Sequence, residues 1–295
     1  MALNLNGSTQ YLYSGSWNPH SQAYPFTFAG WFYTTDMAQN SALMCLDNNT
    51  GGSYINLAQF FGSGTSPNDP VRALTYQTSW ASAATTTGAT TGTWHHFAAV
   101  WAATNDRRVY IDGSSKGTDS TTKTFGAQTT QLGIGARYAN AAGAAADLLF
   151  GGKLAHCAAW TSALSDANVA SLAGGSYPTA VDSGNLEDYW DLISDSNSDG
   201  GNTGTSLTEV GSPTYDADDP LSSTVTVELA ASGDIVFSGT ADLGVSPAVV
   251  LEASGVITFV GAADLTKQTV VKGLTSDGTR MIIGLGNDEL WYEGV

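Results

Sequence analysis

The amino-acid sequence predicts an all-β protein: a two-sheet antiparallel sandwich over residues 1–219, followed by a small β-repeat domain over residues 220–295. Three features predict this fold class. Short runs of β-branched and aromatic residues recur throughout the first domain, and clusters of Gly, Ser, Asn and Thr separate these runs. After Pro220 the runs become shorter and one segment repeats at a fixed offset, which is typical of stacked units.

Three segments have the pattern of strands inside a sandwich, because apolar residues occupy both of their alternating faces. They are residues 26–33, 97–101 and 155–160. Polar turns rich in Asp, Asn and Gly, at residues 47–52 and 111–114, are expected to close hairpins between strands.

One short helix interrupts the strand pattern. Ser165 can act as its N-cap, and Asp166 in the first turn suits the positive end of the helix dipole. Gly174 and Gly175 end the helix. We expect this helix to pack on the edge of the sandwich.

The composition argues against several classes of protein. The 27 acidic and 10 basic residues give a formal net charge of −17, which disfavours a nucleic acid or an anionic membrane surface as partner. A hydrophobic fraction of 42%, with 10% aromatic residues, is enough for a core. Residues 1–7 lack the regions of a signal peptide, and no run reaches the ~18 apolar residues of a membrane span. We therefore expect a protein made in a cytoplasm.

Two cysteines, Cys45 and Cys157, are too few for a disulfide framework or a four-ligand zinc site. Each lies in an apolar, strand-like stretch, so we expect both to be buried. The sequence leaves open whether they pair with each other.

The C-terminal domain contains an internal repeat. Residues 230–243 align with residues 252–265 at an offset of 22, with nine of fourteen positions identical, and a weaker third copy follows. This period predicts stacked hairpins, which cannot each bury a core alone and must pack on themselves, on the first domain or on another chain. The residues expected to serve this assembly are Phe237, Phe259, Trp291 and Tyr292.

Seven motifs occur along the first domain in an order that resembles a known family. The motifs are Ala2–Gly7, Trp94–Trp101, Val109–Gly113, Leu132–Ala136, Phe150–Ala155, Trp160–Ala167 and Tyr189–Leu192. This series resembles the laminin-G-like, concanavalin A-like jelly-roll superfamily, in its bacterial and phage branch, over about residues 1–219. The resemblance implies a jelly-roll sandwich without fixing an activity, because that superfamily includes lectins, adhesive modules, glycosidases and virion proteins. The repeats of the second domain resemble Ser-Gly-x-Ile-x-Phe-x-Gly units of phage structural proteins.

Residues for catalysis are not arranged as glycosidases of this superfamily arrange them. Their Glu-x-Asp-x-x-Glu motif is absent, and the nearest acidic cluster places Glu187 and Asp191 on one strand face and Asp188 on the other. His95 and His96 are adjacent in a strand and point to opposite faces, so we expect one to be buried and the other exposed. Neither a zinc site nor a Ser/His/Asp triad has support from spacing.

Residues 195–200 have two interpretations, and a calcium-binding loop is one of them. Asp195, Asn197 and Asp199 alternate as oxygen ligands before Gly200, but Ser206 stands where a bidentate Glu is expected. The other interpretation is a solvated loop, so calcium is possible and no other cofactor is expected.

Sugar binding needs an aromatic side chain beside groups that hydrogen-bond hydroxyls. The candidate residues are Asp47, Asn49, Tyr54, Trp80, Tyr138 and Asn140. Taken alone, each of these residues is better explained by a role in a hairpin or at the edge of the core.

The leading hypothesis is a non-enzymatic structural or adhesive protein of a virion, such as a head decoration, cement or fibre component. Its expected partners are other virion proteins, further copies of itself and host-surface glycans. The alternative is a carbohydrate-binding lectin or adhesin module of a bacterial surface protein, with calcium as a possible aid. A polysaccharide-degrading enzyme is the third and least favoured possibility.

Overall fold

The computed structural model contains two compact units, Met1–Leu221 and Ser222–Val295. The structure describes residues 1–15, 17, 24–36, 39–47, 55–62, 69–124, 131–137, 146–193 and 205–221, together with strands at 235–238, 257–260, 270–274, 280–286 and 289–294.

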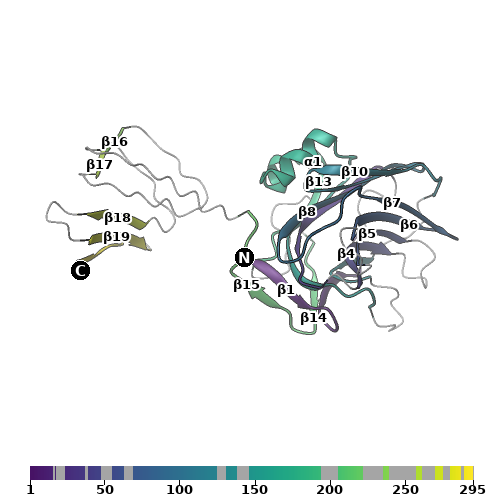
Figure 1. The fold of residues 1–295 in the computed structure, drawn as a ribbon, viewed down its shortest axis with the longest axis horizontal. Coiled ribbons are helices and arrows are strands. Elements are labelled where there is room, and N and C mark those ends of the chain that lie inside the picture. The colour runs from purple at the N-terminus through teal and green to yellow at the C-terminus, as the bar shows by residue number, and fades with distance from the viewer. Residues whose placement is uncertain are drawn as a thin grey trace. The chain divides into compact units, whose positions relative to one another are not determined.

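Unit 1 is a sandwich of two antiparallel sheets (Figure 1). The first sheet runs β10 (Ser114–Asp119), β9 (Asp106–Ile111), β8 (Trp94–Ala103), β3 (Phe26–Tyr33), β12 (Gly151–Trp160), β1 (Ala2–Asn6) and β15 (Thr214–Asp216), with β13 (Leu186–Trp190) also paired to β12. The second sheet runs β14 (Thr208–Val210), β2 (Tyr11–Ser14), β11 (Gln131–Ile134), β4 (Asn40–Asp47), β5 (Ile55–Phe61), β6 (Val71–Tyr76) and β7 (Trp80–Ala84). The predicted two-sheet sandwich is confirmed.

The core between the sheets is rich in aromatic side chains. Phe26 on β3 lies opposite Trp101 on β8, and their rings stack with centroids 4.6 Å apart. Phe28 meets the same tryptophan edge-on at 5.7 Å. Such pairs add about 0.5–1.5 kcal/mol beyond the burial of their area. The apolar runs of the sequence thus form the centre of the sandwich.

The two sheets come together at one edge, where β10 of the first sheet lies against β7 of the second. The Thr86 N–H donates to the Ser115 carbonyl at 3.1 Å. A Cβ on Gly117 would lie only 1.8 Å from the carbonyl oxygen of Ala84, so this approach requires glycine. The contact supports β7 from the first sheet, in addition to its pairing with β6.

The helix α1 (Asp166–Ala173) covers the outer face of the first sheet. Its N-cap Ser165 accepts a hydrogen bond from the Asn168 N–H, as the sequence predicts. Val169 and Leu172 are buried against residues of β3, β8 and β12. The helix therefore lies over central strands and not on the edge of the sandwich, where we expected it. In the described ranges, no helix is long and apolar enough to cross a membrane.

The outer face of the first sheet is also covered beyond α1. Two short turns of 3-10 helix follow, η2 (Pro178–Ala180) and η3 (Ser183–Asn185). The indole N–H of Trp160, on β12, donates to the Val181 carbonyl between them at 2.9 Å. This tryptophan is 1% exposed.

Both cysteines are buried, and neither forms a disulfide. Cys157 lies in the core between the sheets, whereas Cys45 lies on the outer face of the second sheet. Burial raises the pKa of the Cys157 thiol above its usual range. The expectation of buried cysteines is confirmed, and the structure leaves them unpaired with each other.

In unit 2, the first two copies of the repeat form a parallel pair of strands, not a hairpin. β16 (Ile235–Ser238) pairs with β17 (Ile257–Val260), and Ile235 lies opposite Ile257. The two strands run in the same direction, and the offset between paired residues equals the repeat period. Equivalent residues of the first two copies therefore lie opposite each other. β18 (Val270–Leu274), β19 (Arg280–Gly286) and β20 (Glu289–Gly294) form an antiparallel sheet.

Candidate functional site

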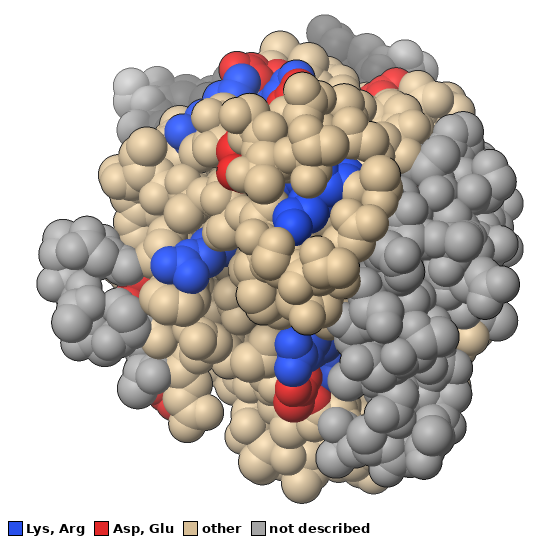
Figure 2. Space-filling model, turned by 90° about the vertical axis from the view of Figure 1, so that its right-hand side faces the viewer, with Lys and Arg blue, Asp and Glu red and all other residues tan. Residues whose placement is uncertain are grey.

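The outer face of the second sheet exposes a strip of side chains along β6 and β7. Residues that lie opposite each other on paired strands share a face of the sheet. Three opposite pairs of β6 and β7 lie on the outer face: Arg72 with Ala84, Leu74 with Ser82, and Tyr76 with Trp80. We define the outer strip as the exposed or half-buried residues of this region: Phe61, Arg72, Tyr76, Trp80, Ser82 and Ala84. The side of unit 1 that carries β5–β7 in Figure 1 faces the viewer in Figure 2, where Lys and Arg are scattered among uncharged atoms.

An aromatic pair forms one end of the outer strip. Trp80 begins β7, and its side chain is 44% exposed. It lies opposite Tyr76, with ring centroids 4.9 Å apart and an interplanar angle of 51°. Because both rings are on the outer face, they form a shelf that faces solvent. Trp80, one of the sugar-binding candidates from the sequence, therefore lies at the surface.

The turn between β6 and β7 is held in place beside this shelf. The Gln77 side-chain amide donates to Thr124 Oγ1 at 2.7 Å, and the Lys123 ammonium donates to Ser79 Oγ at 2.7 Å. These two bonds tie the turn to the chain segment after β10. The shelf is thus supported before any ligand arrives.

A cation–aromatic pair forms the other end of the outer strip. The guanidinium carbon of Arg72 lies 3.3 Å from the centre of the Phe61 ring. Burial lowers the pKa of Arg72, although an arginine stays protonated under ordinary conditions. Arg72 stands four residues before Tyr76 on the same face of β6, about 13 Å along the strand.

Asp47 differs from what the sequence suggested. We expected it in an exposed loop, but it is the last residue of β4 and its side chain is fully buried. It lies opposite Gln131, which is also buried, and opposite Ile55. The strand therefore continues further than the turn pattern indicated, and the Asp47 carboxylate is not accessible to a sugar.

Both histidines of the 95–96 pair are buried, so the expectation that one is exposed is wrong. His95 is 7% exposed and His96 is 1% exposed. The reason is that the core covers one face of β8 and the α1 cluster covers the other. Burial lowers the pKa of His96 to about 3, with Asp112 opposing the shift. The sequence could not show this, because the helix position depends on the tertiary fold.

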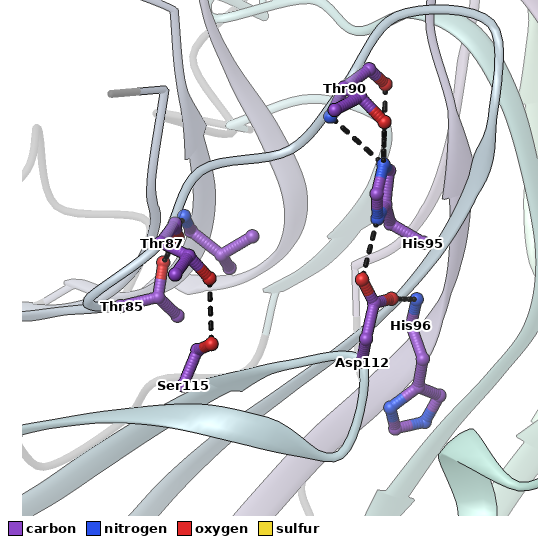
Figure 3. Close-up of polar contacts among 8 residues, drawn as sticks. Thr85, Thr87, Thr90, His95, His96, Asp112 and Ser115 are labelled. Atoms are coloured by element: carbon purple, nitrogen blue, oxygen red, sulfur yellow. Dashed lines mark hydrogen bonds and ion pairs between the residues drawn. The ribbon is translucent and has the colours of Figure 1, made fainter. Parts of the chain in front are cut away.

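Figure 3 shows that His95 joins a loop to the β9–β10 turn. Its Nδ1 lies 2.8 Å from Asp112 Oδ2, and its Nε2 accepts the Thr90 N–H at 2.9 Å. The hydroxyl of Thr90 is 3.0 Å from the same nitrogen. This arrangement resembles a catalytic relay, but the backbone N–H already occupies the Nε2 lone pair. We therefore interpret it as a structural clamp.

Asp188, the central residue of the acidic cluster, likewise has a structural role. Asp188 is fully buried and accepts the indole N–H of Trp17 at 2.8 Å. A second group, the backbone N–H of Thr205, also donates to this carboxylate. Glu187 and Asp191 are only half-buried. In the described ranges, no three His, Cys, Asp or Glu residues are grouped as a metal site requires.

Several predicted site residues lie outside what the structure describes. They are Asn49, Tyr54, Tyr138, Asn140, Asp195, Asn197 and Asp199. For the expected assembly residues Phe237, Phe259, Trp291 and Tyr292, only the strand assignment is described.

The sequence reasoning missed Phe61, Arg72 and Tyr76. A signal for two of them was present, since Arg72, Leu74 and Tyr76 alternate with Val71, Ala73 and Thr75. That alternation assigns Arg72 and Tyr76 to one face of a strand. It does not indicate which face is the outer one.

Comparisons with known proteins agree with this architecture. A family model described as the concanavalin A-like lectin/glucanases superfamily matches residues 6–170, more than half of the chain. A search of curated protein sequences gives no match.

Three solved structures illustrate the similarity. A pentraxin from Limulus polyphemus has 16% identity and a TM-score of 0.45, with 60% of this chain and 83% of that chain covered. Domain 4 of an arabinanase from Geobacillus stearothermophilus, in complex with arabinotriose, has 18% identity, a TM-score of 0.44 and coverage of 58% and 76%. A CBM40 of a Ruminococcus gnavus sialidase, bound to sialyllactose, has 12% identity, a TM-score of 0.47 and coverage of 59% and 96%.

Proposed function

The chain belongs to the concanavalin A-like lectin/glucanases superfamily, and on this premise we propose that unit 1 is a carbohydrate-binding module. The aromatic shelf of Tyr76 and Trp80 is its binding surface. The family includes lectins, which supports a sugar as the ligand, and the outer strip offers a surface for it.

The exposure of Trp80 is the main observation that supports the proposal. A large aromatic ring that is 44% exposed leaves much of its apolar area in water. A sugar ring has an apolar face of C–H groups, which can cover such an aromatic ring and displace that water. Tyr76 widens the shelf and adds a hydroxyl at its margin. Ser82, exposed on the same face two residues further along β7, adds a second hydroxyl.

We further propose that this module binds without catalysis. Two observations support this view. The buried carboxylate of Asp188 is engaged by Trp17, and the Nε2 lone pair of His95 is engaged by a backbone N–H. His95 cannot take a proton at Nε2 without losing its bond from the Thr90 N–H, and the Asp188 carboxylate is fully buried, out of reach of a bound substrate.

The test is a glycan array followed by calorimetric titration of the strongest binder. We expect Trp80→Ala to lower affinity at least tenfold. Tyr177→Ala is the matched control, because Tyr177 is 37% exposed but belongs to the segment beside the first sheet. We expect that variant to bind normally. Absence of binding to any glycan, or equal loss in both variants, would contradict the proposal.

A chelator arm in the same titration tests the calcium prediction for Asp195, Asn197 and Asp199. If calcium assists binding, excess chelator weakens it and added calcium restores it. Unchanged affinity in chelator would exclude calcium from glycan recognition while leaving the role of Trp80 intact.

A second candidate function is that of a virion component. One observation favours it, namely the parallel pairing of β16 and β17 at the repeat offset, since repetitive strands suit an assembly. Mass spectrometry of purified particles tests it directly. Recovery of the chain only as a free monomer from cell lysate would count against this candidate and against an expected homo-oligomer.

A further inference from the structure

We propose that Arg72 recognises an anionic group, a carboxylate or a sulfate, on a sugar that the aromatic shelf holds. The ligand is then an acidic oligosaccharide. This inference deepens the proposed function and rests on it.

Arg72 differs from the other cationic side chains that the structure describes. Arg107, Arg108, Lys116, Arg137 and Lys153 each form an ion pair with at least one aspartate. The ammonium of Lys123 donates to Ser79. Within the same set, Arg72 has neither a carboxylate partner nor a hydrogen bond, and its one polar interaction is with the Phe61 ring. In a chain with 27 acidic residues, the described part thus leaves one guanidinium without an internal anion.

The geometry of Arg72 suits a planar anion. Its Nε is buried and lacks a partner. The side chain as a whole is only half-buried, and its two Nη groups are not among the buried atoms that lack a partner. The guanidinium carbon lies 3.3 Å from the centre of the Phe61 ring, and this contact restrains the position of the two Nη groups. A guanidinium held in this way offers paired donors that match the two oxygens of a carboxylate or sulfate.

A neutral amide stands next to Arg72. Gln59 is its opposite residue on β5, on the same outer face of the sheet. The Gln59 side chain is 6% exposed, so its role is to line the base of the site.

The distance between the two ends of the outer strip sets the size of the ligand. Arg72 and Tyr76 are about 13 Å apart along β6. Leu74 and Ser82 lie between them on the same face. A single sugar cannot contact both ends, whereas a short oligosaccharide can stack on Trp80 and present a charged unit to Arg72.

The overall charge of the chain does not prevent this recognition. At physiological ionic strength, charges act over about 8 Å, so the net charge of −17 is screened and local groups dominate. Burial alone shifts the pKa of Arg72, with no carboxylate contributing. The described surroundings of the guanidinium therefore lack a competing internal anion.

The experiment uses the full chain and three glycan sets on one array: neutral oligosaccharides, the same backbones with a uronic or sialic acid, and the same backbones with a sulfate. We expect an acidic member to bind at least tenfold more tightly than its neutral counterpart, as charge-assisted hydrogen bonds predict. The carboxylate and sulfate arms identify which anion is preferred.

Arg72→Gln should lower the affinity for the acidic member to that of its neutral counterpart, and Arg72→Lys should restore only part of the difference. Trp80→Ala should weaken neutral and acidic members alike. Near-ultraviolet circular dichroism confirms that each variant is folded. Equal binding of neutral and acidic members, or a preference that survives Arg72→Gln, overturns the inference and leaves the proposed function standing. No binding by the wild-type chain overturns both.

Discussion

The outer faces of the two sheets differ in how their polar and aromatic side chains are covered and paired. On the first sheet, α1 covers the central strands, and polar groups at its margin find partners within the chain: Asp166 accepts from both Tyr110 and Lys116. On the second sheet, the outer strip leaves Trp80 in solvent and Arg72 without a carboxylate among the described residues. A face sealed by its own helix serves stability. The outer face of the second sheet is buried around Cys45 and Leu57, and the outer strip keeps an aromatic and a cationic group at the surface.

The largest effect is expected when a tryptophan on each outer face is replaced by alanine and the free energies of unfolding are compared. Trp160→Ala should destabilise the protein by about 3–5 kcal/mol, because it leaves a cavity under α1 and removes the bond to Val181. Trp80→Ala should cost less than about 1 kcal/mol, because its ring is exposed. Urea denaturation followed by circular dichroism measures both. Equal losses would show that the second face is also part of the folding core.

The sealed face should also make the protein sensitive to acid through His96. Its pKa lies at about 3, below the usual value of about 6.5, so the folded state favours the neutral imidazole. This contribution to stability is present above pH 6.5 and is lost as the pH falls toward 3. Between pH 7 and pH 5 the loss from this group is about 2 kcal/mol.

Denaturation of His96→Phe at the same two pH values measures this contribution, because phenylalanine does not titrate and other groups titrate in both proteins. We expect the variant to lose about 2 kcal/mol less than the wild type over this interval. An identical pH dependence in the two proteins would mean that His96 is protonated in the folded state.

A smaller effect is expected at the end of the covering helix. Ser165→Ala removes the acceptor for the Asn168 N–H and should cost about 1 kcal/mol. Ser165→Asp keeps an acceptor there and serves as the control. A loss in both variants would point to packing around residue 165 and not to the cap.

The smallest effect is predicted for the open face. Arg72→Met removes a buried Nε without a partner, which offsets the loss of the contact with Phe61. The free energy of unfolding should change by no more than about 0.5 kcal/mol, as for an ordinary surface substitution. Denaturation in urea measures the change. A loss several times larger would show that Arg72 is a structural residue, and it would weaken the case for ligand recognition.

Local patterns in the sequence predict much of unit 1. Apolar runs at 26–33, 97–101 and 155–160 correspond to β3, β8 and β12, and the cap at Ser165 begins α1. The Asp-Gly pair at 112–113 forms the turn between β9 and β10, where both residues have a positive φ. These signals are local because strand alternation, caps and turns depend on a few neighbouring residues.

The features that the sequence did not predict depend on contacts between distant segments. His96 is buried because α1, far later in the chain, covers its face. Asp47 is buried because its strand extends into the predicted turn. Arg72 stands out only when every other described lysine and arginine has been matched with its partner, and those partners are spread over the whole unit. The parallel pairing in unit 2 depends on the path between copies, which the repeat period does not specify.

The parallel register of β16 and β17 has a consequence for how this protein can change over time. The first two copies meet at equivalent residues, so duplication of one of them could add a further strand in the same register, about 4.8 Å along the ladder. Such a segment can act as a spacer whose length is set by copy number, while unit 1 keeps its own sequence and shape.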